Sequence, residues 1–193
     1  VVLKVTGLTN HKIRNVSFEL KKGEILGIAG LVGAGRTETV RTLFGADSLE
    51  SGEISIKGKR VRIKNPATAI KHGIGLIPED RKREGLMLSQ SISSNISLVV
   101  IRNLCKGLFI EDKKEKSLLK EQVELLQIKA GSLEFPASSL SGGNQQKIVL
   151  AKWLSTSSDI LIFDEPTRGI DVGAKREIYD FLFQLRAAGK SLI

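Results

Sequence analysis

Alternating apolar and polar positions predict strands in the first third of the chain. Residues 1–5 and 16–20 alternate in this way, and residues 21–24 (Lys-Lys-Gly-Glu) are typical of a turn. Residues 25–29 form a short, almost continuously apolar run, which favours a strand buried in a parallel sheet. Residues 53–63 predict a hairpin around Gly58.

The region from about residue 92 to residue 128 has a different character and predicts helices. It is rich in charged residues, and its apolar positions form a stripe on one side of a helix: Leu118, Leu119, Gln122, Val123 and Leu126. Because this region interrupts a series of strand and helix patterns, we expect a helical subdomain inserted between two halves of an α/β core.

The last third returns to alternating helices and strands. Residues 145–154 predict a helix and residues 160–163 a buried strand. Residues 175–188 predict an amphipathic helix with a core face of Ile178, Phe181, Leu182 and Leu185. This order argues for a parallel sheet. Residues 191–193 have the pattern of a beginning strand, so we expect the chain to end in the middle of its fold.

A glycine-rich segment follows the predicted strand at 25–29 and precedes a helix predicted at about 37–44. It reads Gly30-Leu31-Val32-Gly33-Ala34-Gly35-Arg36-Thr37 and matches the phosphate-loop pattern G-x-x-x-x-G-K-[ST] except at Arg36. Glycines let backbone N–H groups approach phosphate oxygens, and the helix directs its positive end to the same place. A hydroxyl at Thr37 suits Mg²⁺. The alternative is a glycine-rich turn that binds no ligand.

Two acidic residues, Asp164 and Glu165, end the apolar strand predicted at 160–163. Ligands gather at the carboxyl ends of parallel strands, so we expect both acids beside the phosphate loop. Neighbouring residues of a strand point opposite ways. We assign Asp164 to the Mg²⁺ shell and Glu165 to water positioning or general-base catalysis. Two solvated acids at a strand end are the alternative.

Composition narrows the class of protein. The 193 residues are 41% hydrophobic and 26% charged, as in a globular domain. No apolar run reaches the roughly 20 residues of a membrane-spanning helix. One cysteine and two histidines cannot make a structural zinc site, so a metal would need oxygen ligands. The net charge of +9 comes from scattered basic residues, which favours a solvated basic face over a nucleic-acid surface.

A further motif resembles a known family. Leu140-Ser141-Gly142-Gly143-Asn144-Gln145-Gln146, followed by Asp164-Glu165-Pro166-Thr167, is similar to the signature and Walker B motifs of ABC ATPases. The resemblance implies that Ser141, Gly142, Gly143 and Asn144 contact the γ-phosphate bound by an opposite protomer. It also implies ATP binding by the residues Gly30, Gly33, Ala34, Gly35, Arg36, Thr37 and Glu38.

More narrowly, the chain resembles the second ATPase domain of tandem ATPases that power monosaccharide import. Three segments carry this resemblance in addition to the phosphate loop: Pro78 to Leu86 (PEDRKREGL), Ser141 to Lys147 (SGGNQQK) and Pro166 to Gly173 (PTRGIDVG). Glu79 stands where the family has a glutamine, and we group it with Thr37 and Asp164 as a metal ligand.

The resemblance sets the expected fold class: an α/β P-loop NTPase with a mostly parallel core sheet, an antiparallel β subdomain and an inserted helical subdomain. We expect one ABC ATPase domain over residues 1–193, truncated at its C-terminus. Its parts are a β and phosphate-loop part at 1–90, the helical subdomain at 91–140, and a last part at 141–193 with the signature, Walker B and the following helix.

The implied function is ATP hydrolysis, with Mg²⁺, that drives import of a sugar such as ribose. The expected partners are a second ATPase domain, membrane permease subunits and, indirectly, a sugar-binding protein, at the cytoplasmic face of the membrane.

Arg36, Glu38 and Glu79 depart from the usual pattern, so we expect weak turnover at this loop. The alternatives are a non-hydrolysing regulatory half and an ABC ATPase acting on nucleic acid or ribosomes. No aromatic residue for stacking adenine is evident near the start, and His11 is the one ring that we consider there.

Overall fold

The computed structural model describes residues 1–193, with the exception of the side chain of Ala174. The chain divides into two compact units. The first unit contains Val1–Leu76, Ser158–Asp164 and Arg176–Ile193, and the second contains Ile77–Ser157 and Glu165–Lys175. The fold is the expected α/β class. The three-part division at residues 90 and 140 differs from these units and stays a prediction.

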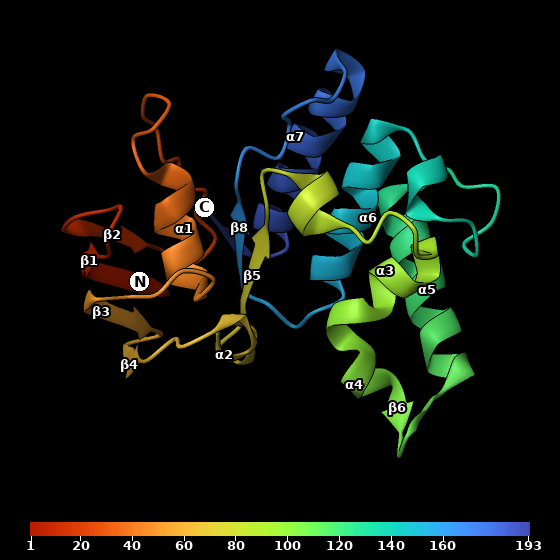
Figure 1. The fold of residues 1–193 in the computed structure, drawn as a ribbon, viewed down its shortest axis with the longest axis horizontal. Coiled ribbons are helices and arrows are strands. Elements are labelled where there is room, and N and C mark those ends of the chain that lie inside the picture. Colours follow the sequence, from red (N-terminus) through yellow and green to blue (C-terminus); the bar gives the residue numbers. More distant parts are fainter. The chain divides into compact units, whose positions relative to one another are not determined.

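A four-stranded antiparallel sheet opens the first unit, in the order β2-β1-β3-β4 (Figure 1). Its strands are β1 (Leu3–Thr9), β2 (Val16–Leu20), β3 (Ser51–Ile56) and β4 (Lys59–Val61). Leu3 pairs with Leu20, and Val5 pairs with Ile54. All four side chains are buried, so alternate positions of the strands form one core face. The predicted hairpin around Gly58 is confirmed as β3 and β4.

A three-stranded sheet has the order β5-β8-β9, with β5 (Ile74–Ile77), β8 (Ile160–Phe163) and β9 (Ser191–Leu192). β8 and β9 are parallel, as predicted. The strand predicted at 25–29 is largely wrong: Ile25 makes an isolated parallel bridge to Leu192, and Leu26 N donates to Leu192 O at 2.9 Å.

Three helices belong wholly or partly to the first unit. They are α1 (Arg36–Phe44), α2 (Pro66–Lys71) and α7 (Val172–Ala187), whose residues from Arg176 onward lie in this unit. The predicted core face of α7 is confirmed, since Ile178, Phe181 and Leu185 are buried and Leu182 is half-buried.

The second unit is mainly helical. Its core is formed by α3 (Ile92–Ser97), α5 (Asp112–Leu126) and α6 (Gly142–Leu154), which pack side by side (Figure 1). On α5, the predicted stripe is confirmed by the buried side chains of Leu119, Gln122 and Leu126. The shorter helical elements are a π-helix η1 (Arg81–Gly85), η2 (Leu98–Val100), α4 (Ile101–Leu104) and η3 (Ala137–Ser139).

A small hairpin interrupts this helical region and was not expected from the sequence. Its strands β6 (Cys105–Lys106) and β7 (Phe109–Ile110) turn through Gly107, which has a φ of 65°. Leu108 at the tip is 95% exposed, so an apolar side chain here does not mark a core position.

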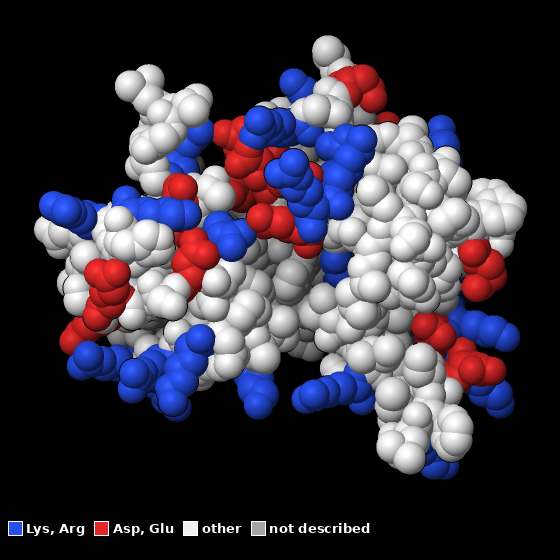
Figure 2. All heavy atoms as spheres, in the orientation of Figure 1, with Lys and Arg blue, Asp and Glu red and all other residues white. Residues whose placement is uncertain are grey.

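Charged side chains are spread over both units. On the face shown in Figure 2, blue basic and red acidic side chains are interspersed. Some form ion pairs within the first unit: Lys57 Nζ lies 2.8 Å from Asp159 Oδ2, which holds the pKa of Asp159 below its ordinary value. Among the described residues, no helix is both long and apolar enough to cross a bilayer.

Candidate functional site

The phosphate loop, residues 30–37, is closed tightly at its glycines. Gly33 and Gly35 have φ angles of 84° and 83°, in the left-handed region that favours glycine. A Cβ on Gly30 would lie 2.9 Å from Ala34 Cβ, and a Cβ on Gly35 would lie 2.9 Å from Ile13 Cγ2. This conformation therefore requires glycine at positions 30 and 35.

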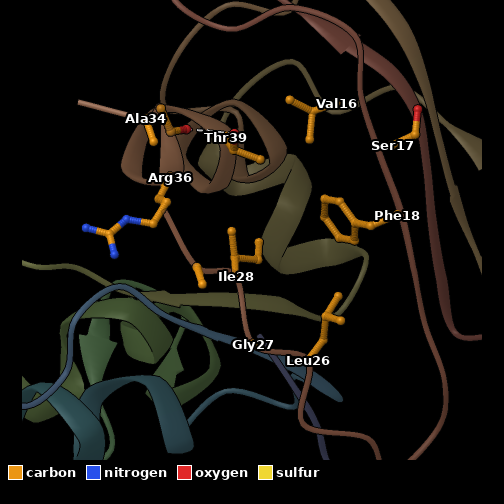
Figure 3. Close-up of a pocket in the computed structure, with 11 residues that line it drawn as sticks. Val16, Ser17, Phe18, Leu26, Gly27, Ile28, Ala34, Arg36 and Thr39 are labelled. Atoms are coloured by element: carbon orange, nitrogen blue, oxygen red, sulfur yellow. Dashed lines mark hydrogen bonds between the residues drawn. The ribbon is translucent and has the colours of Figure 1, made fainter. Parts of the chain in front are cut away.

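The loop leads directly into α1. Gly35 is the N-cap, and no side chain caps the helix. The Thr39 hydroxyl donates to Gly35 O at 2.7 Å and so binds the loop to the first turn (Figure 3). The first N–H groups of a helix have no partner within it, and the helix dipole makes this end positive. This arrangement fits a phosphate group.

A pocket of about 360 Å³ lies beside the loop within the first unit. Its wall is apolar, with Val16 and Phe18 of β2 opposite Leu26 and Ile28 (Figure 3). The guanidinium of Arg36 points away from this wall. Phe18 was overlooked in the sequence, although the alternation of Val16, Phe18 and Leu20 places it on the inner face of β2. His11 is exposed and does not line the pocket.

Asp164 follows β8 and is only 8% exposed. β8, β9 and residues 24–26 run parallel in that order, so Asp164 and the beginning of the phosphate loop lie at the same edge of the first unit. Two strand spacings, about 10 Å, separate the two strands that carry them. The hydroxyl of Thr37 and the carboxylate of Asp164 are oxygen donors that suit Mg²⁺.

Protein groups alone do not complete a metal site here. Among the described residues, no group of three or more His, Cys, Asp and Glu side chains could hold a metal. Magnesium commonly takes one or two protein ligands together with phosphate oxygens and water. Thr37 and Asp164 fit that kind of site, and their roles remain a prediction.

Glu165 begins the turn after Asp164 and is part of the second unit. Its φ of 44° is left-handed, a strained conformation for a residue with a side chain, and such strain is common at functional sites. Arg168 N donates to Glu165 O at 3.0 Å, which closes the turn. The carboxylate side chain is exposed.

Glu79, also in the second unit, forms an ion pair with Arg168. A carboxylate engaged in this way would have to exchange a cationic partner for a metal ion. Its predicted role as a metal ligand is not tested by the ion pair and remains a prediction.

The signature turn, Ser141–Asn144, begins α6. Ser141 is the N-cap, and its Oγ accepts from Asn144 N at 3.4 Å and from Asn144 Nδ2 at 3.2 Å. Asn144 Oδ1 in turn accepts from Lys129 N at 2.9 Å. Gly142 and Gly143 supply the first helical turn, and Ser141 is exposed. A fixed, positively polarised helix start of this kind can receive an anion.

The predicted residues thus fall into two groups. The first unit brings together Asp164 and the loop residues Gly30, Gly33, Ala34, Gly35, Arg36, Thr37 and Glu38. The second unit contains Glu79, Glu165 and the signature turn.

A phosphate loop that opens a helix, an acid-terminated strand and a Ser-Gly-Gly helix start together define an ATP-binding cassette. A family model described as ABC transporter matches residues 13–168, and the chain belongs to this family. Solved cassettes share the fold. One is a nucleotide-free ATP-binding cassette from an ABC transporter, with a TM-score of 0.85, 19% identity and coverage of 99% of this chain and 79% of that one.

Curated relatives are similar over the whole chain. It is 51% identical to a putative ribose/galactose/methyl galactoside import ATP-binding protein of Burkholderia lata, over 100% of this chain and 38% of that protein. It is 47% identical to a ribose import ATP-binding protein of Geobacillus kaustophilus, over 99% of this chain and 39% of that protein. The chain therefore spans less than two-fifths of the length of these relatives.

Proposed function

We propose that this chain is an ATP-binding domain of an ATPase that powers import of a monosaccharide such as ribose. Its family membership and its similarity to ribose and galactoside import proteins support this function. In this proposal the domain works at the cytoplasmic face of the membrane, together with permease subunits and, through them, a sugar-binding protein.

The second part of the proposal is a division of labour between two ATPase domains. The observation that carries it is a capped signature turn with an exposed Ser141, in a chain whose phosphate loop has arginine in place of lysine. Arginine presents a planar fork that is larger than an ammonium group, so it does not reproduce a lysine beneath the β- and γ-phosphates. Glu38 adds a negative charge beside the same phosphates. The loop of this domain therefore turns over slowly, while its signature turn completes the site of a second domain.

Each predicted residue has a place in this chemistry. Backbone N–H groups of the loop and of α1 bind the phosphates, and Thr37 and Asp164 hold Mg²⁺, which neutralises developing charge on the phosphate oxygens. Glu165 orients the attacking water or accepts its proton. Ser141 and the N–H groups at the start of α6 bind the γ-phosphate held by the second domain.

Replacing Ser141 in the whole protein, together with its membrane subunits, tests the division of labour. Ser141→Ala removes a hydroxyl that holds the turn, and we expect ATP hydrolysis to fall about 100-fold, as for loss of one transition-state donor. Ser138→Ala, which changes an exposed serine three residues earlier, is the matched control and should retain activity. Equal activity of the two variants would contradict the proposal.

A regulatory half that binds ATP without hydrolysing it is the second candidate. The arginine in the loop and the engagement of Glu79 by Arg168 favour it. With Ser141→Ala as the background, hydrolysis at the second domain's site is low, and any part of the remaining hydrolysis that depends on Glu165 comes from this domain's own loop. Adding Glu165→Gln should lower the remaining hydrolysis if the loop is a slow catalyst, and should leave it unchanged if the loop only binds.

A further inference from the structure

The side chain of Arg81 reaches two other segments of the second unit. Its Nη1 donates to Arg168 O at 3.0 Å, and its Nη2 donates to Gly169 O at 3.2 Å. The same Nη2 lies against the signature turn, because a Cβ built on Gly142 would be 2.9 Å from it. One guanidinium group thus lies between the turn that begins α6 and the loop that follows Glu165.

A second arginine makes this link reciprocal. Arg168, whose carbonyl oxygen accepts from Arg81, forms an ion pair through its own guanidinium with Glu79. Glu79 lies two residues before Arg81. The segments around residues 80 and 168 are therefore joined by two hydrogen bonds from Arg81 and one ion pair from Arg168, which restrict sliding between them more than one contact would.

The π-helix η1, which begins at Arg81, is also fixed to α6. Lys152 Nζ donates to Gly85 O at the far end of η1. A Cβ on Gly85 would lie 3.0 Å from Val149 Cγ2, so η1 packs closely on α6. At its near end, Asp80 Oδ1 accepts from the backbone N–H groups of Lys82 and Arg83. Arg81 therefore projects from a rigid base, and π-helical turns are frequent at functional sites.

The Nε of Arg81 is buried and has no hydrogen-bond partner among the described residues. Leaving a charged donor unpaired costs stability. Burying the guanidinium therefore has a cost at Nε, which the two hydrogen bonds from Nη1 and Nη2 offset, so the position of Arg81 depends on these two bonds.

We propose that Arg81 is a positioning residue that holds the signature turn, through Gly142, at a fixed distance from the loop at Gly169. This role deepens the proposed function and rests on it, because the signature turn is the part that serves the second domain's ATP. Residue 142 must then be glycine for a second reason besides phosphate binding, because any side chain there displaces Arg81.

Hydrogen–deuterium exchange of the whole protein without nucleotide tests the placement directly. With Arg81→Ala, we expect peptides covering residues 141–150 and 165–175 to exchange about tenfold faster, because two charge-assisted hydrogen bonds are lost. Arg81→Lys keeps the charge and should restore part of the protection. Arg83→Ala is the matched control, since Arg83 lies in the same helix but is 88% exposed. Unchanged exchange in Arg81→Ala, or an equal change in Arg83→Ala, would overturn the proposal.

ATP hydrolysis by the same variants separates positioning from general stability. Arg81→Ala should lower kcat about tenfold and change KM less than about twofold, because the turn acts on the transition state. Arg81→Lys should recover part of kcat. If Arg81→Ala fails to fold, the comparison of Arg81→Lys with Arg83→Ala provides the test.

The two proposals fail in different ways. Faster exchange in Arg81→Ala with unchanged activity of Ser141→Ala would keep the placement of Arg81 and reject the division of labour. Loss of activity in Ser141→Ala with unchanged exchange in Arg81→Ala would keep the division of labour and reject the placement of Arg81.

Discussion

Lys152 offers a test of the second unit's core that does not depend on function. Its side chain is only 6% exposed on α6, and its Nζ donates to Gly85 O. Burial lowers the pKa of this ammonium from 10.5 to about 8. A charged lysine in this place is therefore costly, and Lys152→Met, which replaces it with an apolar side chain of similar length, should remove the cost.

The size of the effect follows from the two pKa values. A difference of about 2.5 units corresponds to about 3 kcal/mol at 1.36 kcal/mol per unit. Below pH 8 both the folded and the unfolded state hold the proton, so the full penalty applies. Between pH 8 and 10.5 the unfolded state holds a proton that the folded state has lost, so wild-type stability rises with pH by up to about 1.4 kcal/mol per unit. The penalty disappears above pH 10.5.

Urea unfolding followed by the fluorescence of Trp153, the single tryptophan, measures this effect in the second unit. The free energy of unfolding of Lys152→Met minus that of the wild type should fall by about 2 kcal/mol between pH 7 and pH 9.5. Loss of the hydrogen bond to Gly85 O lowers this difference at neutral pH but does not make the difference depend on pH. Gln146→Met, which replaces a buried neutral side chain of α6, is the control. A difference that is constant with pH for Lys152→Met would show that burial does not lower the pKa of Lys152.

Three further predictions concern the first unit and the turn after Asp164. Gly35→Ala should cost about 1–3 kcal/mol and weaken nucleotide binding, because of its positive φ and the close approach to Ile13; a thermal melt and an ATP titration check this. Glu165→Gly should keep the free energy of unfolding within about 1 kcal/mol of wild type, since glycine adopts a left-handed φ without strain, while the loop's own hydrolysis is lost. A larger destabilisation would show that the left-handed φ of Glu165 is not strained. Lys57→Ala should raise the pKa of Asp159 toward its ordinary value, which an NMR titration of the carboxyl carbon detects; an unchanged pKa would show that the ion pair does not form.

The elements predicted most accurately are those fixed by local chemistry. The glycines of the phosphate loop require particular backbone angles, and α1 follows at the expected place. The signature helix begins at Gly142, earlier than the predicted residue 145, because Ser141 caps it. The pattern of glycine and serine residues carries this information without reference to the rest of the chain.

Features that depend on distant neighbours were not predictable. The apolar run at 25–29 pairs with Leu192, more than 160 residues further along the chain, and the local pattern does not reveal this partner. The apolar residues of the β6–β7 hairpin are exposed, so hydrophobicity alone is misleading there. Arg81 contacts carbonyl groups 87 and 88 residues further along the chain, and its sequence neighbourhood is simply charged.

In the proposed division of labour, Arg36 makes this domain's own phosphate loop slow while its signature turn serves a second domain. The most direct measurement is ATP hydrolysis by the whole protein carrying Ser141→Ala, with and without Arg36→Lys. Since Ser141→Ala lowers turnover at the second domain's site, a change in the remaining turnover on adding Arg36→Lys reports this loop. We predict that Arg36→Lys raises that remainder by about tenfold, because a compact ammonium then lies beneath the phosphates. An unchanged or lower rate would contradict this division of labour.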